Sequence, residues 1–283
     1  MLNEVLDWMG LKENGIYCDC TVGGGGHLTA MLRSTKTAKF IGVDCDPAAI
    51  DHSRRKTAGF SNRCWFFEDN FINLDIILDK LNIALVNGIL FDLGVSYHQV
   101  TTASRGFSFE RQGRLLMRMS PRYPALSERL RRSSEEEIAR VLKEYGDVRN
   151  YRRLGREIHE HRANLSSTIE LRNLIENAVP RRFLKKNLHK VFQALRIWTN
   201  DELDNLRRGL VVALHRLHRG GRMLVISYHS GEDRIVKRFF RDSSKEGKAL
   251  LLRKKAVKPH DNEVKVNPSA RSAKLRMIEK CAS

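Results

Sequence analysis

Short apolar runs alternate with helical patterns through the first third of the chain, and this alternation restricts the possible folds more than any other feature of the sequence. Runs typical of buried strands occupy residues 16–20, 39–43, 63–67 and 83–91. Between them, apolar residues recur at helical spacing in residues 27–33, 47–56 and 74–81. Strands that alternate with helices favour parallel strands joined by crossover helices. The sequence therefore predicts an α/β fold built on a parallel sheet.

The alternation stops near residue 100. From there to residue 191 the sequence indicates no strand, but it carries Arg-rich and Glu-rich helical stretches, at 135–145, 152–162 and 169–178. A long helical pattern follows at 192–217, then a turn at Gly220 and Gly221, a buried strand at 223–227, a helix around 235–240 and a last edge strand at 274–278. Residues 253–266 are basic and predict a mobile segment without a regular element. We therefore predict one α/β domain made of residues 1–100 and 192–283, interrupted by a helical insertion at 101–191.

The charge of the chain points to a polyanionic partner. Lys and Arg number 51 against 33 Asp and Glu, a net charge of +18. Such a surface attracts phosphate backbones at long range, and anionic membranes would also fit. No apolar run approaches the ~20 residues that cross a bilayer, and the first residues carry acids among helically spaced apolar positions rather than a signal sequence. We therefore expect a cytoplasmic protein that binds nucleic acid and no membrane.

The cysteines predict neither disulfides nor a metal site. They number five, an odd set that lacks paired metal-ligand spacing. Cys18 and Cys20 stand two apart in an expected strand, so both should face the same side. Reduced and mostly buried thiols are the expected state.

A glycine-rich turn lies where the first strand should lead into the first helix. The segment reads Asp19-Cys20-Thr21-Val22-Gly23-Gly24-Gly25-Gly26-His27. Glycine permits positive φ and close backbone approach, and a helix N-terminus offers unpaired N–H groups to an acceptor. A turn of this kind also uses glycine for purely steric reasons, so the run alone is weak evidence for a nucleotide-like ligand.

Asp44, at the end of the second strand, supports the ligand interpretation. It follows the glycine turn by about the ~20 residues at which a carboxylate binds ribose hydroxyls. A dinucleotide fingerprint counted from Gly23 requires a small residue where this chain has Leu28, which disfavours NAD. S-adenosylmethionine uses the same loop and acid without a pyrophosphate, and it is the preferred cofactor. The alternative role of Asp44 is an N-cap for the helix that follows.

Asp92 ends the fourth strand, at the edge where ligands bind in open parallel sheets. A carboxylate there could accept a hydrogen bond from a substrate amine beside the sulfonium methyl group. The lone pair of a nucleobase amine is delocalised into its ring, so alignment and loss of a proton must supply its nucleophilicity. Asp92 could instead contact the amino end of the cofactor or cap its own loop.

Six motifs, taken in order, resemble one family nearly end to end. They lie at residues 19–27, 92–96, 105–109, 192–197, 226–237 and 267–276. The family is that of the bacterial small-subunit ribosomal RNA cytosine-N4 methyltransferases, known as MraW or RsmH. The resemblance implies a Rossmann-like S-adenosylmethionine-dependent methyltransferase domain with an inserted helical domain, and a target cytosine in the decoding region of the ribosome. It further implies cofactor contacts from Gly25, Gly26, His27, Asp44, Phe71, Asp92 and Gln99.

The chain departs from the family pattern at several positions near the expected target pocket. Three positions that are acidic in the family are neutral here, at Gln112, Leu116 and Ser120, and a serine of the family is Tyr97. The short His-x-Pro-Val stretch before the first helix is absent. These departures leave a second function open, a non-catalytic RNA-binding assembly factor that retains the methyltransferase fold.

The expected partner is small-subunit ribosomal RNA within an assembled or nearly assembled small subunit, and a homodimer is left open. Arg181, Arg182, Lys185 and Lys186 have little acid nearby and are the main phosphate-binding candidates. Arg118, Arg196 and Arg234 complete the predicted RNA-binding set. His229, after the strand at 223–227, is predicted with Asp92 as a catalytic residue that lines the pocket for a flipped cytosine. The alternative for His229 is a buried, hydrogen-bonded histidine.

Overall fold

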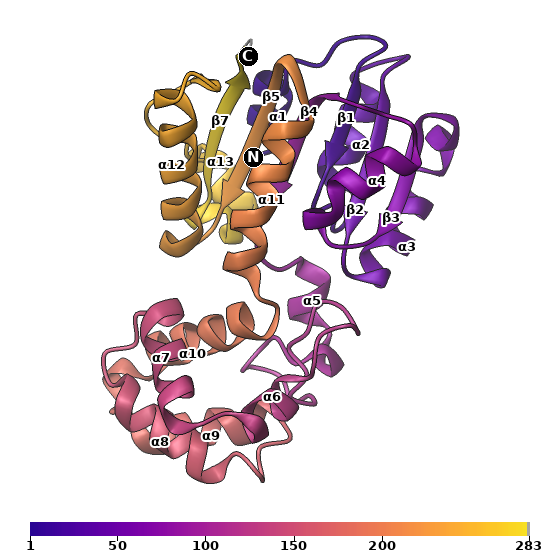
Figure 1. The fold of residues 1–283 in the computed structure, drawn as a ribbon. Coiled ribbons are helices and arrows are strands. Elements are labelled where there is room, and N and C mark those ends of the chain that lie inside the picture. The colour runs from indigo at the N-terminus through magenta and orange to yellow at the C-terminus, as the bar shows by residue number, and fades with distance from the viewer. Residues whose placement is uncertain (282–283) are drawn as a thin grey trace. The chain divides into compact units, whose positions relative to one another are not determined.

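The structure is a computed structural model that describes residues 1–281, and the chain divides into two compact units (Figure 1). The sheet unit combines Met1–Gly94 with the chain from Leu203 onward, and the helical unit spans Val95–Glu202. Within the described residues, no helix is both long enough and apolar enough to span a membrane.

The sheet unit contains a seven-stranded sheet in the order β3-β2-β1-β4-β5-β7-β6. Neighbouring strands from β3 to β5 pair in parallel, and β7 pairs antiparallel with both β5 and β6. The bounds are β1 (Ile16–Asp19), β2 (Lys39–Asp44), β3 (Cys64–Glu68), β4 (Val86–Asp92), β5 (Leu217–Ser227), β6 (Ala249–Leu251) and β7 (Lys274–Lys280). The predicted α/β fold class is confirmed.

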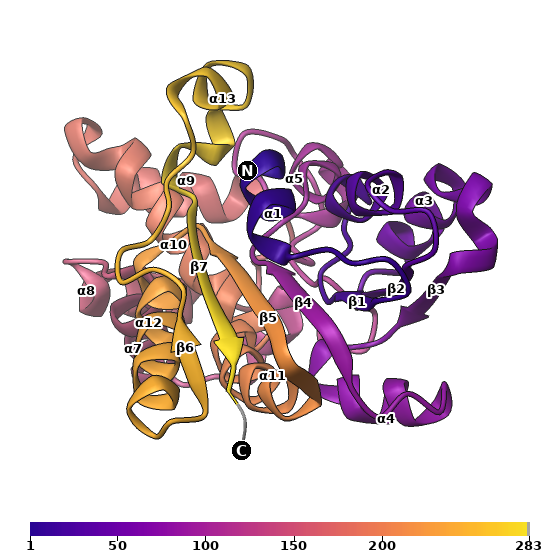
Figure 2. The same cartoon turned by 90° about the horizontal axis from the view of Figure 1, so that it is seen from above.

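Helices cover both faces of this sheet because successive strand side chains point to opposite faces. Cys18 of β1 and Cys20, just after it, pack into the core with α4 (Leu74–Lys80), α11 (Glu202–Arg216) and α12 (Ser230–Lys245). Tyr17, which precedes Cys18, packs on the other side with α1 (Leu2–Met9), α2 (Gly26–Arg33) and α3 (Pro47–Lys56). Figure 2 shows these two groups of helices on opposite faces. Cys18 and Cys20, both free thiols, lie on the same face of the sheet, as predicted.

The helical unit has a hydrophobic core of its own. It contains α5 (Tyr97–Thr101), α6 (Leu126–Arg132), α7 (Glu135–Gly146), α8 (Tyr151–His161), α9 (Thr168–Ala178) and α10 (Leu184–Thr199). Leu142, Ile158, Ile175 and Leu195, from four of these helices, are completely buried in that core. Each such side chain contributes roughly 1.5–3 kcal/mol when it leaves water. The predicted helical insertion is therefore present as an independently packed unit.

The ends of the helical unit lie outside residues 101–191. The unit extends to Glu202 because Leu188, Phe192 and Leu195 of α10 pack into its core. The single helical pattern predicted at 192–217 is two helices, since Asp201 adopts a left-handed φ of 49° between them. The side chain of Asn200 fixes this break by donating to the carbonyl of Met117 at 2.9 Å.

Three further predictions in the last third of the chain were wrong. Gly220 and Gly221 do not end a helix in a turn but lie within β5, where its register with β4 shifts. The strand at 274–278 is not an edge strand, because the short β6 pairs with its outer side. Residues 253–266 contain α13 (Asp261–Val266) and are followed by a 3-10 turn at Pro268–Ser272.

Candidate functional site

The glycine turn connects β1 to α2 at the carboxyl edge of the parallel strands. Gly23 and Gly25 have φ values of 48° and 67°, which side chains other than glycine rarely adopt. A Cβ at Gly25 would also lie 2.9 Å from the hydroxyl of Ser53. The turn is held from α3, since Ser53 Oγ and Lys56 Nζ each donate to one of its carbonyls at 3.0 Å. Its backbone is therefore fixed in place.

The side of the turn that Gly24 and Gly26 face is open. A Cβ built on Gly24 or on Gly26 would meet no other atom within 4 Å. Gly25 is the N-cap of α2 and has no side chain, so no side-chain cap occupies the first N–H groups of that helix. Gly26, a predicted cofactor contact, thus borders open space at the N-terminus of α2, whereas Gly25, the other predicted contact in this turn, is buried against Ser53.

Asp44 lies against the glycine turn. Its Oδ2 accepts a hydrogen bond from the backbone N–H of Gly23 at 2.9 Å, and Oδ1 accepts one from the backbone N–H of Asp46 at 2.9 Å. The alternative in which Asp44 caps the next helix is wrong, because Asp46 is the N-cap of α3 and accepts from Ala48 at 3.0 Å. Carboxylate oxygens can accept more than one hydrogen bond, so these two contacts do not by themselves exclude a ribose.

Asp92 is held between two side chains at the end of β4. The hydroxyl of Tyr228 donates to its Oδ1 at 2.9 Å, and Nε2 of His27 lies 3.4 Å from its Oδ2. The backbone N–H of Asp92 donates to Thr21 Oγ1 at 2.6 Å. Tyr228 was missed in the sequence, because an aromatic residue at the end of an apolar strand gives no polar signal. The available clue to Tyr228 was its place in the motif at residues 226–237, directly after the expected strand at 223–227.

A buried acid and the imidazole of His27 extend this group. Burial raises the pKa of Asp19 to about 7, against the lowering effects of His27 and of the Thr21 backbone N–H. Burial alone would lower the pKa of His27, but the hydrogen bond and charge of Asp92, together with the charge of Asp19, raise it overall. The protonated form of His27 is thus more favoured than that of a free imidazole. Burial, followed by the charge of Asp92, raises the pKa of Tyr228, which keeps its hydroxyl a donor.

His229 is the N-cap of α12. Its Nδ1 accepts from the backbone N–H groups of Gly231 at 3.2 Å and Glu232 at 3.4 Å, while Nε2 lies 3.2 Å from Glu232 Oε1. Glu232 is buried and accepts from the backbone N–H of Tyr228 at 2.8 Å. These contacts match the alternative of a hydrogen-bonded histidine, and a catalytic role for His229 stays a prediction.

The two remaining predicted cofactor residues lie in different units. Phe71, after β3, packs edge-on against Phe91 with 5.3 Å between ring centroids, and it fills the space beside Gly209. Gln99 belongs to the helical unit, where its Oε1 accepts from the backbone N–H of Ser96 at 2.9 Å in the capping box of α5. Their contacts with a cofactor stay predictions.

The predicted RNA-binding residues differ in how free they are. Arg196 forms two hydrogen bonds with the carboxylate of Glu202, at 2.9 and 2.8 Å, and Arg118 donates to the carbonyl of Tyr123 at 3.1 Å. The other five are exposed, and no ion pair of theirs is seen within the described part of the chain: Arg181, Arg182, Lys185, Lys186 and Arg234. The exposed cations are therefore the stronger candidates for phosphate contact.

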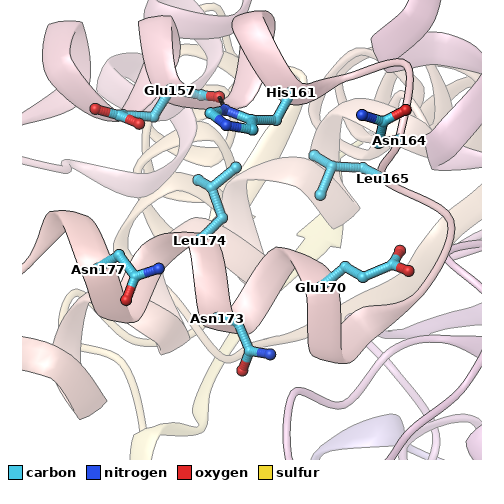
Figure 3. A pocket seen from close by; sticks show the side chains of 8 residues that line it. All are labelled: Glu157, His161, Asn164, Leu165, Glu170, Asn173, Leu174 and Asn177. Atoms are coloured by element: carbon cyan, nitrogen blue, oxygen red, sulfur yellow. Dashed lines mark hydrogen bonds between the residues drawn. The ribbon is translucent and has the colours of Figure 1, made fainter.

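A separate cavity of about 420 Å³ opens between α8 and α9 in the helical unit (Figure 3). None of the predicted site residues lines it, and its walls include the carboxylates of Glu157 and Glu170. Glu157, Glu160 and His161 have ligand atoms within 4.8 Å of one another, but the group is largely exposed. We assign neither feature to the predicted reaction.

Comparisons with known proteins agree with this geometry. The model of the MraW methylase family matches residues 1–281. Ribosomal RNA small subunit methyltransferase H of Coprothermobacter proteolyticus is 44% identical over 283 residues, which cover 99% of this chain and 94% of that protein. The protein of the same name from Thermotoga neapolitana is 41% identical, with 99% and 94% covered.

Solved structures provide a comparison of the fold alone. A Streptococcus mutans protein assigned to the methyltransferases, determined in complex with SAH, aligns with a TM-score of 0.50 at 15% identity. The alignment covers 99% of this chain and 98% of that one. The predicted Rossmann-like methyltransferase fold is confirmed.

Proposed function

The chain belongs to the MraW methylase family, and on that premise we propose that it methylates the N4 amine of a cytosine in the decoding region of small-subunit ribosomal RNA. The substrate is an assembled or nearly assembled small subunit in the cytoplasm. The net charge of +18 supports a polyanionic substrate, and the relatives carry the name of a small-subunit ribosomal RNA methyltransferase. NAD chemistry has no place in a methylase family.

S-adenosylmethionine is the methyl donor, and the residues present fit it. The open space over Gly24 and Gly26 accommodates a cofactor that lies close to the backbone. Asp44, fixed against the turn, is assigned to the ribose hydroxyls, and His27 and Phe71 are assigned to the walls of the same site. When bound, the cofactor supplies an electrophilic methyl group on a sulfonium centre.

Asp92 is the group we assign to the reacting amine. Because Tyr228 and His27 hold its two oxygens, the carboxylate cannot rotate freely, and its remaining lone pairs point in a fixed direction. When the N4 amine donates a hydrogen bond to one of these lone pairs, its nitrogen is aligned and the carboxylate can accept its proton. The held carboxylate at the edge that carries the glycine turn is the single observation on which this function depends most.

The base must leave its stack before the amine can reach Asp92, because a carboxylate at the end of a strand cannot enter a stacked helix. The exposed cations Arg181, Arg182, Lys185 and Lys186 of the helical unit are assigned to the RNA around the target. Arg196, already paired with Glu202, is assigned to the unit's own structure instead.

Asp92→Asn tests the proposal. The amide keeps the size of the side chain and one acceptor but loses the charge, so we expect single-turnover methyl transfer to fall by roughly 10²–10⁴-fold. Affinity for S-adenosylmethionine, measured separately by calorimetry, should change only a few-fold. The assay uses small subunits from a strain that lacks this modification, and circular dichroism verifies that the variant is folded.

Two other outcomes are equally clear. A large loss of cofactor affinity with a normal rate at saturating cofactor makes Asp92 a binding residue only. If the unmutated protein binds small subunits but transfers no methyl group to them, the assembly-factor function replaces this one, and the neutral residues Leu116 and Ser120 become its explanation.

A further inference from the structure

The sheet unit carries a run of cations for which the proposed reaction gives no role. We call residues 253–271 the C-terminal basic segment. It contains six Lys and Arg against two acids, Asp261 and Glu263. All six cations are exposed, and none forms an ion pair within the described residues: Arg253, Lys254, Lys255, Lys258, Lys265 and Arg271. Their charge is therefore available to an external anion.

The segment is fixed to the sheet at both ends. Val257 and Leu275 exchange two backbone hydrogen bonds of 2.9 Å, so the chain after β6 runs along the outer side of β7. At the other end Ala270 and Ala273 are almost fully buried. The cations thus stand on a fixed surface, and binding through them loses less conformational entropy than binding through a free tail.

The segment leads into the edge of the sheet where the candidate site lies. β7 is antiparallel to β5, so its first residue, Lys274, pairs with Ser227 at the carboxyl end of β5. Tyr228, the partner of Asp92, follows directly. Glu263 of α13 contacts the amine of Met1. The pKa of this amine is lowered overall, because burial outweighs the raising effect of the charges of Glu4 and Asp92. Figure 2 shows α13 beside α1 on this side of the sheet.

We infer that the C-terminal basic segment binds the phosphodiester backbone of the RNA next to the nucleotide whose base enters the site. The inference rests on the proposed function and adds a second RNA-binding surface, on the sheet unit itself. Unneutralised cations gain affinity for RNA through release of its condensed counterions. RNA rather than an anionic membrane is the partner we infer, because RNA is the substrate of the proposed function.

The test compares two variants that lose the same charge. The segment variant replaces Arg253, Lys254, Lys255 and Lys258 with Gln. The control variant replaces Arg33, Lys36, Lys80 and Arg219 with Gln; these are exposed cations of the same unit, also without an ion pair in the described chain. Arg33 and Lys80 are the last residues of α2 and α4, Lys36 follows α2, and Arg219 lies near the start of β5, so the control residues lie toward the opposite edge of the sheet.

Affinity for unmodified small subunits is measured at several salt concentrations between about 50 and 200 mM, a range that resolves the slope of the logarithm of the binding constant against the logarithm of the salt concentration. We expect the segment variant to flatten this slope by about 0.7–0.9 for each phosphate group that it no longer neutralises, and to bind at least about tenfold more weakly at low salt. The control variant should keep the slope of the unmutated protein. Affinity for S-adenosylmethionine should be the same in all three proteins.

Equal slopes for the two variants, or an unchanged slope in the segment variant, overturn the inference. Binding to phosphatidylserine vesicles is measured as a second test. If the segment variant no longer binds vesicles but still binds small subunits, the segment binds a membrane, and the inference is again overturned. If the unmutated protein transfers no methyl group, this result contradicts the proposed function but not the inference about the segment, because the salt slopes are measured without catalysis.

Discussion

At the scale of single residues, the four glycines of the turn are not equivalent. Positions 23 and 25 require glycine because Gly23 and Gly25 have positive φ values. A side chain at Gly25 would also collide with Ser53. Gly24 and Gly26 have neither constraint, so the fold of the turn alone does not explain their lack of a side chain. A ligand above the turn does explain it.

Gly26→Ala should therefore separate ligand binding from folding. Because its Cβ would meet no protein atom, we expect the melting temperature to stay within a degree or two, while affinity for S-adenosylmethionine falls at least about tenfold through overlap with the added methyl group. Gly25→Ala is the matched control and should lower the melting temperature as well. Calorimetric titration and thermal melts measure the two quantities. Normal cofactor affinity in Gly26→Ala would remove this turn from the site.

Asp19 gives the protein a specific dependence of stability on pH. Its pKa of about 7 in the folded state lies above the ~3.9 of an unfolded chain, so between these values the folded state holds a proton that the unfolded state has released. The contribution to the free energy of unfolding therefore falls as pH rises through this window and is constant above it. The raised pKa of His27 acts in the same direction, since its stabilisation is lost as pH rises through the folded value.

We predict that Asp19→Asn removes this slope. The difference in the free energy of unfolding between the variant and the unmutated protein should grow from pH 5 to pH 8 in favour of the variant. The measurements stay above pH 5 because carboxylates such as Asp147 and Glu170, whose pKa values are lowered by their hydrogen bonds, contribute the opposite trend only at lower pH. Denaturant titrations at several pH values measure it, and a difference independent of pH would show that Asp19 ionises normally.

At the scale of elements, α12 connects the site to the edge of the sheet. Asp233 in its first turn accepts from Lys274 Nζ at 2.9 Å and from Arg276 Nε at 2.7 Å, both on β7. His229 caps the same turn, and Glu232 holds the backbone of Tyr228. The start of α12 thus sets the position of Tyr228, and through it the orientation of Asp92.

Substitution of His229 can distinguish capping from catalysis. His229→Ala should lower the free energy of unfolding by about 0.5–2 kcal/mol, the usual effect of losing an N-cap acceptor. His229→Asn supplies another good N-cap and should recover most of this stability. If His229 acts only as a cap, single-turnover methyl transfer recovers together with stability. Restored stability without restored transfer would instead support the predicted catalytic role.

At the scale of the whole molecule, each unit carries its own core and its own exposed cations. In the helical unit Arg181 and Arg182 occupy a 3-10 turn, and Lys185 and Lys186 begin α10. None of the four belongs to the core of that unit. Their charge can therefore be reversed without removing apolar packing.

Changing Arg181, Arg182, Lys185 and Lys186 to Glu should weaken binding to small subunits and flatten its salt dependence by about 0.7–0.9 in log–log slope for each phosphate group that is no longer bound. Cofactor affinity should stay near normal. The control reverses Arg131, Arg132, Arg152 and Arg153, which are equally exposed; the first two precede the acidic first turn of α7, and the last two lie in the first turn of α8. A slope that is the same in both variants would mean that the helical unit contributes only net charge to binding.

Much of this protein could be predicted from its sequence because the signals are local. Apolar spacing reports which face of a strand or helix is buried, so the alternation before residue 100 predicted the parallel sheet, and the loss of strand patterns after it predicted the helical unit. The glycine turn and Asp44 were found for the same reason, since a strand end and the following helix start are adjacent in the chain. The +18 charge requires only counting.

Only the tertiary structure decided which distant residues meet. Asp92 and Tyr228 are 136 positions apart, and they touch because β4 and β5 pair side by side. The burial that raises the pKa of Asp19 and the pairing of Arg196 with Glu202 likewise depend on packing. The sequence could not place β6 outside β7 or break the helical pattern at Asp201, because a short strand and a left-handed residue are stabilised by their neighbours in space. Periodicity is a property of a segment, whereas strand order and side-chain partners are properties of the folded chain.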